Sequence, residues 1–301
     1  MKTTAQLREL MKRPGVIQGG GVGDAAQALL VESVGYPAVY MSGSYVNYTY
    51  GLPDGSLTLT EIVDRVRQIC ARVKIPVIAD ADEGFGGVLK IIRTVQDFEN
   101  AGAAALHMED MLAKKHGHPM PVANMLKNLK VALDTRRDPD FVVIARTDAM
   151  APWREGVDNN REACEQEAFE RSMAYAEAGA DVIMPMYPTI EWLKRYGKRI
   201  PKPILPLFGV DASHRPPIGD ATGNLRASAC TVNELEQYNV KIVVYPTNMV
   251  SHAFAFMKKE YAAWLAAGAC IATPEDQNNR WGANALVGVP QKYATLAKYG
   301  E

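Results

Sequence analysis

The chain has 301 residues, with 33 Lys and Arg residues against 34 Asp and Glu residues and a net charge of −1. This length can bury a full core, and the balanced charge argues against binding to nucleic acid or to an anionic membrane surface. No apolar run approaches the roughly 18 residues that cross a bilayer, and the first segment, MKTTAQLRELMKRPG, lacks the apolar core of a secretory signal. Four widely spaced cysteines are typical of buried thiols in a reducing compartment, so we expect a cytoplasmic protein.

Apolar runs of strand length recur along the chain and alternate with helical patterns. The runs cover residues 15–20, 37–43, 75–82, 103–110, 141–148, 181–187, 203–209 and 241–247. The helical stretches cover residues 24–34, 59–73, 89–101, 121–135, 160–178, 189–197, 231–238 and 249–267. The runs lack alternation of apolar and polar residues, which is typical of parallel strands buried on both faces. Eight such units favour an α/β fold of the closed (β/α)₈ TIM-barrel type over residues 1–270, with an open doubly wound sheet as the alternative.

Several of the helical stretches are predicted to end in a left-handed residue. Gly35, Gly102 and Gly179 stand directly before an apolar run, where a Cβ atom would be strained, and Asn239 can adopt the same conformation. Residues 271–301 follow the eighth unit. We expect this C-terminal extension to pack on the barrel or on a neighbouring subunit.

The glycine-rich segment GGGVGD, residues 19–24, resembles a nucleotide-binding loop only superficially. It has Asp24 where the third glycine of G-x-G-x-x-G would stand, and no Lys-Ser or Lys-Thr pair follows it. The segment is better explained as a tight turn between a strand and a helix, with Asp24 as the helix N-cap.

Polar residues follow four of the predicted strands at the point where barrel enzymes place their chemistry. They are Ser42, Gly43 and Ser44, then Asp80 and Asp82, then Glu109 and Asp110, then Arg146 and Asp148. Carboxylate oxygens suit a hard cation such as Mg²⁺ or Mn²⁺. For any single acid, capping of a helix or pairing with Arg146 is the competing explanation. A zinc site at His116 and His118 is not favoured, because no third nitrogen or sulfur ligand is placed nearby.

Five motifs identify a resemblance to a known family. YMSGS, YGLPDGSLTLTE, IPVIADADEGFGG, HMEDMLAKKHGH and VIARTDA resemble, in order and spacing, the isocitrate lyase/phosphoenolpyruvate mutase superfamily, over about residues 15–150 and more loosely to about residue 246. The branch most similar is that of the 2-methylisocitrate and 2,3-dimethylmalate lyases. The resemblance implies a TIM barrel that swaps its C-terminal helix with a partner, in a homotetramer built as a dimer of helix-swapped dimers.

The same resemblance implies the roles of individual residues. It implies Mg²⁺ near Asp80, Asp82 and Glu109, with Asp54 behind the water shell of the metal. It implies that a small 2-oxo or 2-hydroxy carboxylic acid is bound by Arg146 and by the turn of Ser42, Gly43 and Ser44, with Tyr40 at the reacting oxygen. The loop of the family supplies further candidates, namely Lys115, His116, Gly117 and His118.

This sequence also departs from the pattern of the family. His116 replaces the loop cysteine, and Met186 replaces a glutamate after the sixth strand. Leu207, Gly209 and Ser251 replace an asparagine, a threonine and an arginine. The departures indicate that the half of the site that binds the 2-oxo acid is kept, while the distal half is a more apolar pocket. Candidates to line this pocket are Met184, Met186 and Phe208.

We therefore expect a Mg²⁺-dependent carbon–carbon lyase that cleaves a substituted 2-hydroxy acid and releases a 2-oxo acid such as pyruvate. His116 is the candidate proton donor or base, because an imidazole exchanges protons near neutral pH. The alternatives are hydrolysis or decarboxylation of a substituted oxaloacetate, and a non-catalytic protein that binds small acids. His107, inside the fourth run, is interpreted as a packed strand residue.

Overall fold

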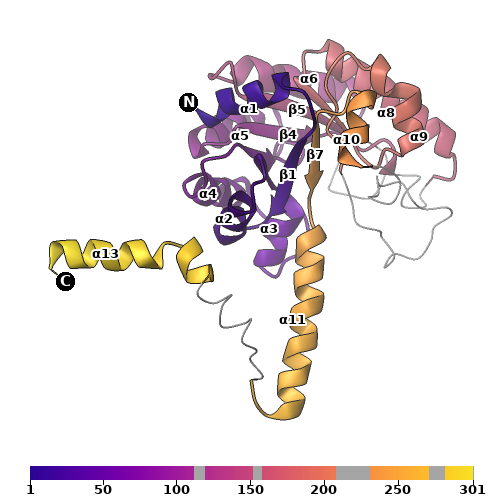
Figure 1. The fold of residues 1–301 in the computed structure, drawn as a ribbon. Helices are drawn as coiled ribbons and strands as arrows, with labels where there is room; N and C mark the ends of the chain where they lie inside the picture. The colour runs from indigo at the N-terminus through magenta and orange to yellow at the C-terminus, as the bar shows by residue number, and fades with distance from the viewer. Residues whose placement is uncertain (112–118, 152–157, 208–230, 271–281, 301) are drawn as a thin grey trace.

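The computed structural model describes residues 1–111, 119–151, 158–207, 231–270 and 282–300. Its core is one parallel sheet of seven strands, in the order β6-β5-β4-β3-β2-β1-β7, surrounded by helices (Figure 1). The strands are β1 (Ile17–Val22), β2 (Ala38–Met41), β3 (Val77–Asp80), β4 (Ala105–Glu109), β5 (Val142–Thr147), β6 (Val182–Pro185) and β7 (Ile242–Tyr245). The sheet curls into the barrel that the sequence predicts.

The described part of the predicted strand at 203–209, residues 203–207, forms only isolated bridges. Ile204 bridges to Ile183 on one side and to Val240 on the other, and Leu207 bridges to Val244. These contacts connect β6 to β7 and close the sheet. No regular ladder forms over residues 203–207, because Pro203 and Pro206 have no N–H to donate.

Helices cover the outside of the sheet close to their predicted positions. They are α2 (Ala25–Ser33), α4 (Leu59–Cys70), α5 (Val88–Ala101), α6 (Val122–Thr135), α8 (Arg161–Glu177), α9 (Ile190–Tyr196), η1 (Gly197–Arg199), α10 (Val232–Leu235), η2 (Glu236–Tyr238) and α11 (Asn248–Ala267). The described residues also form α1 (Thr3–Lys12) and α3 (Gly43–Thr49), which lie outside the predicted helical stretches, and α13 (Val289–Tyr299) in the C-terminal extension, where the resemblance implies a helix. The predicted left-handed residues are confirmed, since φ is +91° at Gly35, +97° at Gly102, +101° at Gly179 and +67° at Asn239.

Two apolar cores fill the fold. The larger core lies between the sheet and the outer helices and includes Ile62, Phe98 and Trp192. The smaller one fills the inside of the barrel with side chains from the strands, among them Ile78 and Ile144. Burial of apolar surface on both faces explains why the strands read as continuous apolar runs.

The end of the barrel where the strands begin is closed by α1. Leu7 of this helix is fully buried in the inner core. Arg8 donates from Nε to the Asp140 carbonyl and from Nη2 to the Phe141 carbonyl, directly before β5, and pairs with Asp181 at 2.9 Å. With this end filled and covered, access to the inside of the barrel is from the opposite end of the strands.

The glycines of the GGGVGD segment serve packing. A Cβ atom on Gly21 would lie 1.8 Å from the Tyr245 carbonyl oxygen, so β1 can approach β7 only because this residue has no side chain. Asp24 caps α2 as predicted, accepting from the Gln27 N–H at 2.9 Å. The glycine run lies inside β1 rather than in a turn after it.

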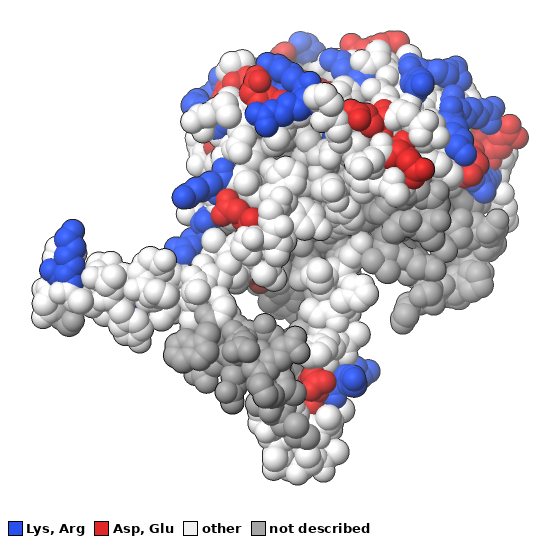
Figure 2. All heavy atoms as spheres, in the orientation of Figure 1, with Lys and Arg blue, Asp and Glu red and all other residues white. Residues whose placement is uncertain are grey.

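The C-terminal helices α11 and α13 extend away from the barrel (Figure 1). α11 buries only Val250 and exposes apolar side chains that include Phe254, Phe256, Tyr261 and Leu265. Charged residues of both signs are interspersed over the visible face of the barrel, while α11 and α13 are mostly uncharged (Figure 2). No helix in the described ranges is both long and apolar enough to span a bilayer. The proposed boundary between residues 1–270 and 271–301 stays a prediction.

Candidate active site at the carboxyl ends of the strands

The predicted acids and Arg146 meet at the carboxyl ends of neighbouring strands. Sheet register places Asp80 beside His107 and Glu109 beside Arg146. The Glu109 backbone N–H donates to the Asp82 carbonyl at 2.8 Å, which joins the segment after β3 to the end of β4. All five side chains are buried. The structure therefore brings these groups together at one end of the barrel.

Asp80 accepts two backbone hydrogen bonds. Its Oδ1 accepts from the Asp82 N–H at 3.0 Å, and its Oδ2 accepts from the Gly43 N–H at 3.0 Å. Burial alone would raise the pKa of this carboxyl, but His107, Arg146 and the two N–H groups offset burial and hold the pKa below its usual value. Asp80 is therefore ionised at neutral pH.

The turn after β2 differs in detail from the expectation. Ser42 is the N-cap of α3, and its hydroxyl accepts from the Tyr45 N–H. The Gly43 N–H, which we expected to meet a substrate carboxylate, donates to Asp80 instead. Ser44 donates a short hydrogen bond to Asp54, which brings Asp54 to the same end of the barrel. The turn therefore holds two carboxylates in place, Asp80 through the Gly43 N–H and Asp54 through the Ser44 hydroxyl.

The described residues would only partly balance a negative charge on Glu109. Its side chain is 1% exposed, and Oε1 has no hydrogen-bond partner in the described part of the chain. Its Oε2 lies 2.9 Å from Arg146 Nη1. Burial raises the pKa of Glu109 well above its usual value, and the nearby charges of Asp148, Asp82 and Asp80 add to the rise while Arg146 opposes it. A cation at this position would restore the ionised form.

Arg146 is held by two acids. Its Nε and Nη2 donate to the two carboxylate oxygens of Asp148, at 2.8 and 2.9 Å, in a bidentate pair. Burial opposes its charge, but Asp148 and Glu109 hold the pKa of Arg146 well above its usual value. Asp148 thus fixes the guanidinium of Arg146. For this acid, pairing with Arg146, the alternative to metal binding, is what the structure shows.

Asp110 also has a structural role. Its Oδ1 accepts from the Asp148 N–H, and its Oδ2 accepts from the Tyr175 hydroxyl at 2.7 Å and from Arg171 at 3.3 Å. Arg171 donates as well to the Met120 carbonyl at 2.8 Å, and the Met120 N–H donates to the Asp110 carbonyl at 2.7 Å. We call Asp110, Met120, Arg171 and Tyr175 the stem cluster. It connects residues on the two sides of segment 111–119.

His107 is a packed strand residue, as expected from the sequence, and it also contacts Tyr40 and Asp80. It is fully buried, its Nε2 lies 2.8 Å from the Tyr40 hydroxyl, and the two rings stack with centroids 5.7 Å apart. Nε2 also lies 3.5 Å from Asp80 Oδ1. Burial lowers the pKa of His107 to about 4, against the opposing effect of Asp80, so the ring is neutral at pH 7. The two-residue spacing of His107 and Glu109, which puts both on one face of β4, was the available signal.

Oxygen donors dominate this end of the barrel. Asp80, Asp82 and Glu109 supply carboxylates, and a buried oxygen of Glu109 lacks a partner among the described residues. No three His, Cys, Asp or Glu side chains in the described ranges are grouped closely enough to hold an ion directly. The donor set therefore fits a hard divalent ion that keeps part of its water shell, which is how Mg²⁺ usually binds to proteins.

The structure describes only some of the remaining candidate residues. Lys115, His116, Gly117, His118, Phe208 and Gly209 fall outside the described residues. Met184 and Met186 are buried in the inner core of the barrel, which agrees both with packing and with an apolar pocket. Leu207 is partly buried against that core, and Ser251 is exposed on α11.

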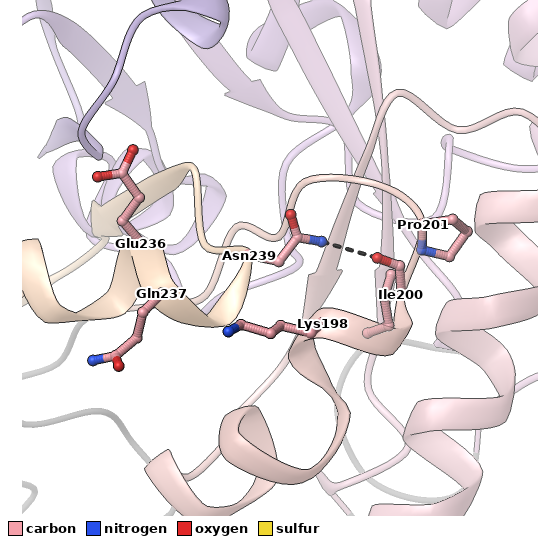
Figure 3. A pocket seen from close by; sticks show the side chains of 6 residues that line it. All are labelled: Lys198, Ile200, Pro201, Glu236, Gln237 and Asn239. Carbon is pink, nitrogen blue, oxygen red and sulfur yellow. Dashed lines mark hydrogen bonds between the residues drawn. The ribbon is translucent and has the colours of Figure 1, made fainter.

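A separate hollow of about 490 Å³ lies away from these residues (Figure 3). It is lined by Lys198, Ile200, Pro201, Glu236, Gln237 and Asn239. These residues precede the bridging residue Ile204 and β7, so the hollow lies at the end where strands begin. It has no part in the carboxylate site.

Comparison with known proteins gives a consistent result. The phosphoenolpyruvate phosphomutase family model matches residues 7–265. The chain is 37% identical to 2,3-dimethylmalate lyase of Eubacterium barkeri over 256 residues, which cover 82% of this chain and 81% of that protein. It is 34% identical to 2-methylisocitrate lyase of Aeropyrum pernix over 248 residues, 80% and 72% of the two chains. The solved structure of a phosphonopyruvate hydrolase in complex with oxalate and Mg²⁺ shares the fold, with a TM-score of 0.81, 24% identity and full coverage of both chains. The two curated relatives are carbon–carbon lyases.

Proposed function

The chain belongs to the phosphoenolpyruvate phosphomutase family, and from this premise we propose that it is a Mg²⁺-dependent carbon–carbon lyase. Its substrate would be a substituted 2-hydroxy acid, and a product would be a 2-oxo acid such as pyruvate. The observation that carries the proposal is the group of buried carboxylates, Asp80, Asp82 and Glu109, beside Arg146 at the open end of the barrel. The lyases among its relatives support the reaction class.

The metal site we propose consists of Asp80, Asp82 and Glu109, with Mn²⁺ as a substitute ion. Asp54 would act from behind this group through Ser44, to which it is hydrogen-bonded. Once bound, Mg²⁺ would supply positive charge for the oxygens of the substrate as negative charge develops on them. The solved hydrolase that contains oxalate and Mg²⁺ supports this ion and a small dicarboxylate as the class of ligand.

The residues of this chain would bind and orient the acid. Arg146, fixed by Asp148, would pair with the substrate carboxylate through N–H groups that Asp148 does not use. Ser42 would donate its hydroxyl hydrogen, and Ser44, whose hydrogen goes to Asp54, would contact the acid through its hydroxyl oxygen. Gly43 gives the space in which Asp80 sits. Tyr40 would contact the oxygen that changes charge as the C2–C3 bond breaks.

The proton for the departing fragment would come from segment 112–118. We propose His116 as the group that donates or accepts this proton, because its ordinary pKa is near neutrality. Lys115, Gly117 and His118 would contact the substrate beside it. These four assignments rest on the resemblance to the family.

The test is release of a 2-oxo acid from purified protein with Mg²⁺. We would use 2,3-dimethylmalate and 2-methylisocitrate as substrates and detect the released 2-oxo acid by its hydrazone. With oxaloacetate as substrate, we would follow its own consumption and identify oxalate and acetate, or pyruvate, by chromatography. Chelation should abolish activity and Mg²⁺ should restore it, and Asp80→Ala should reduce kcat/KM by at least about 10²-fold. Asp64→Ala, at an exposed carboxylate on α4, is the matched control.

The outcomes separate the candidate functions. Cleavage of oxaloacetate to oxalate or to pyruvate and CO₂, without cleavage of the two malate derivatives, would replace the lyase by a hydrolase or a decarboxylase. Binding of oxalate with no turnover of any substrate would indicate a protein that only binds small acids. Wild-type rates in Asp80→Ala would refute all of the metal-dependent versions.

We also propose a homotetramer of helix-swapped dimers. The apolar side chains that α11 exposes, Phe254, Phe256, Tyr261 and Leu265, support burial of this helix against a second copy. Light scattering should give four chains per particle, and the double variant Phe256→Glu/Leu265→Glu should dissociate it. The exposed Lys258→Glu on the same helix is the control. The expected cytoplasmic location is likewise a proposal, which cell fractionation tests.

A further inference from the structure

Tyr40 and His107 form an isolated hydrogen-bonded pair inside the barrel. Tyr40 extends from β2 and His107 from β4, and both are almost completely buried. The Tyr40 hydroxyl lies 2.8 Å from His107 Nε2 and has no second hydrogen-bond partner among the described residues. A phenol has one hydrogen to donate, so the role of this pair depends on which partner is the donor.

The surroundings of the imidazole decide the position of its proton. Nε2 faces two oxygens, the Tyr40 hydroxyl at 2.8 Å and Asp80 Oδ1 at 3.5 Å. Nδ1 is buried and has no hydrogen-bond partner in the described part of the chain. A buried N–H without an acceptor is costly, whereas Nε2–H has two acceptors within reach. The proton therefore belongs on Nε2.

This tautomer makes Tyr40 an acceptor from His107. The hydrogen of the phenol is then free for another oxygen, at the end of the barrel where Asp80 and Arg146 lie. With the proton on Nδ1, the phenol would donate to Nε2 and would have no hydrogen left for a ligand. The choice of tautomer thus decides whether Tyr40 can donate to the substrate.

We propose that His107 is a positioning residue that directs the Tyr40 hydroxyl hydrogen to the substrate oxygen on which negative charge develops. This inference rests on the proposed lyase function and assigns a role to a residue outside the predicted site. It involves hydrogen bonds only, so no proton leaves Tyr40 or His107 during the reaction.

The kinetic test uses four variants in Mg²⁺. Tyr40→Phe and His107→Phe should each lower kcat by about 10²-fold with little change in KM, since the first removes the donor and the second removes the group that directs its hydrogen. The double variant should lose no more than either one, because the two residues act as a unit. His107→Gln, whose amide N–H can still donate to Tyr40, should stay within about tenfold of wild type. Additive losses, or equal losses in His107→Gln and His107→Phe, would overturn the proposal.

A second measurement needs no turnover. In protein with ¹⁵N-labelled histidine and Mg²⁺, the His107 signals, assigned by their loss in His107→Gln, should show a protonated Nε2 and an unprotonated Nδ1. Tyr40→Phe should shift the Nε2–H resonance, while Ser172→Ala, which removes a buried hydrogen bond in α8, should not. A proton on Nδ1 would overturn the inference even in an active enzyme. The predicted tautomer in a protein that cleaves none of the substrates would instead refute only the lyase function.

Discussion

Replacement of Gly43 by alanine is the sharpest test of how this site is built. An added Cβ atom would lie 2.9 Å from Asp80 Oδ2, closer than real Cβ contacts allow, and 3.2 Å from Asp80 Cγ, which is tighter than most. The carboxylate would have to move, and it would weaken or lose the 3.0 Å hydrogen bond from the Gly43 N–H. A hydrogen bond to a charged group contributes about 1.5–3 kcal/mol.

That energy predicts roughly 10- to 100-fold weaker binding of Mg²⁺ by Gly43→Ala. Titration calorimetry with Mg²⁺, or the free Mn²⁺ signal in electron paramagnetic resonance, gives the dissociation constant directly. Gly87→Ala is the matched control, because a Cβ atom there meets no atom within 4 Å and the residue has a negative φ. Equal affinities in Gly43→Ala and wild type would show that Asp80 does not hold the ion.

Three further predictions concern pH, Arg146 and the sheet. Burial raises the pKa of Glu109 in the folded state, so in metal-free protein the free energy of unfolding should fall as pH rises above about 4.5. Mg²⁺ should therefore raise the melting temperature more at pH 8 than at pH 5, and an equal rise at both pH values would contradict this. Asp148→Asn should lower the free energy of unfolding in denaturant by about 3 kcal/mol and raise KM for the substrate, because it removes one partner of a buried ion pair with Arg146. An unchanged KM would show that Arg146 does not bind the substrate. Gly21→Ala should cost more than about 3 kcal/mol, measured by thermal melting, because β1 and β7 would have to separate; wild-type stability would mean that this strand contact is not tight.

The fold could be predicted closely because its signals are local. Buried parallel strands appear as continuous apolar runs, and left-handed residues such as Gly102 and Gly179 mark the ends of helices. Residues 203–207, the described part of the predicted strand at 203–209, were the exception. Their composition is apolar, but Pro203 and Pro206 prevent a regular ladder, and the prediction gave these prolines too little weight.

The site could be predicted in its positions but only partly in its roles. The placement of acids after strands identified Asp80, Asp82 and Glu109 together with Asp148. It could not show that Asp148 has a different role from the other three acids, because its bidentate pairing with Arg146 depends on the folded geometry. The contact between His107 and Tyr40 could not be predicted for the same reason, because the two residues are 67 positions apart in the chain.

The stem cluster has a consequence for how this protein can change. Met120 N–H and the Asp110 carbonyl hold the two flanks of segment 111–119 together, and Arg171 binds both flanks from α8. The two flanks are therefore joined by hydrogen bonds of their own, so these bonds do not depend on the number or identity of residues 112–118. New reactivity could arise by changes confined to that one insert, while the carboxylates and Arg146 stay as they are.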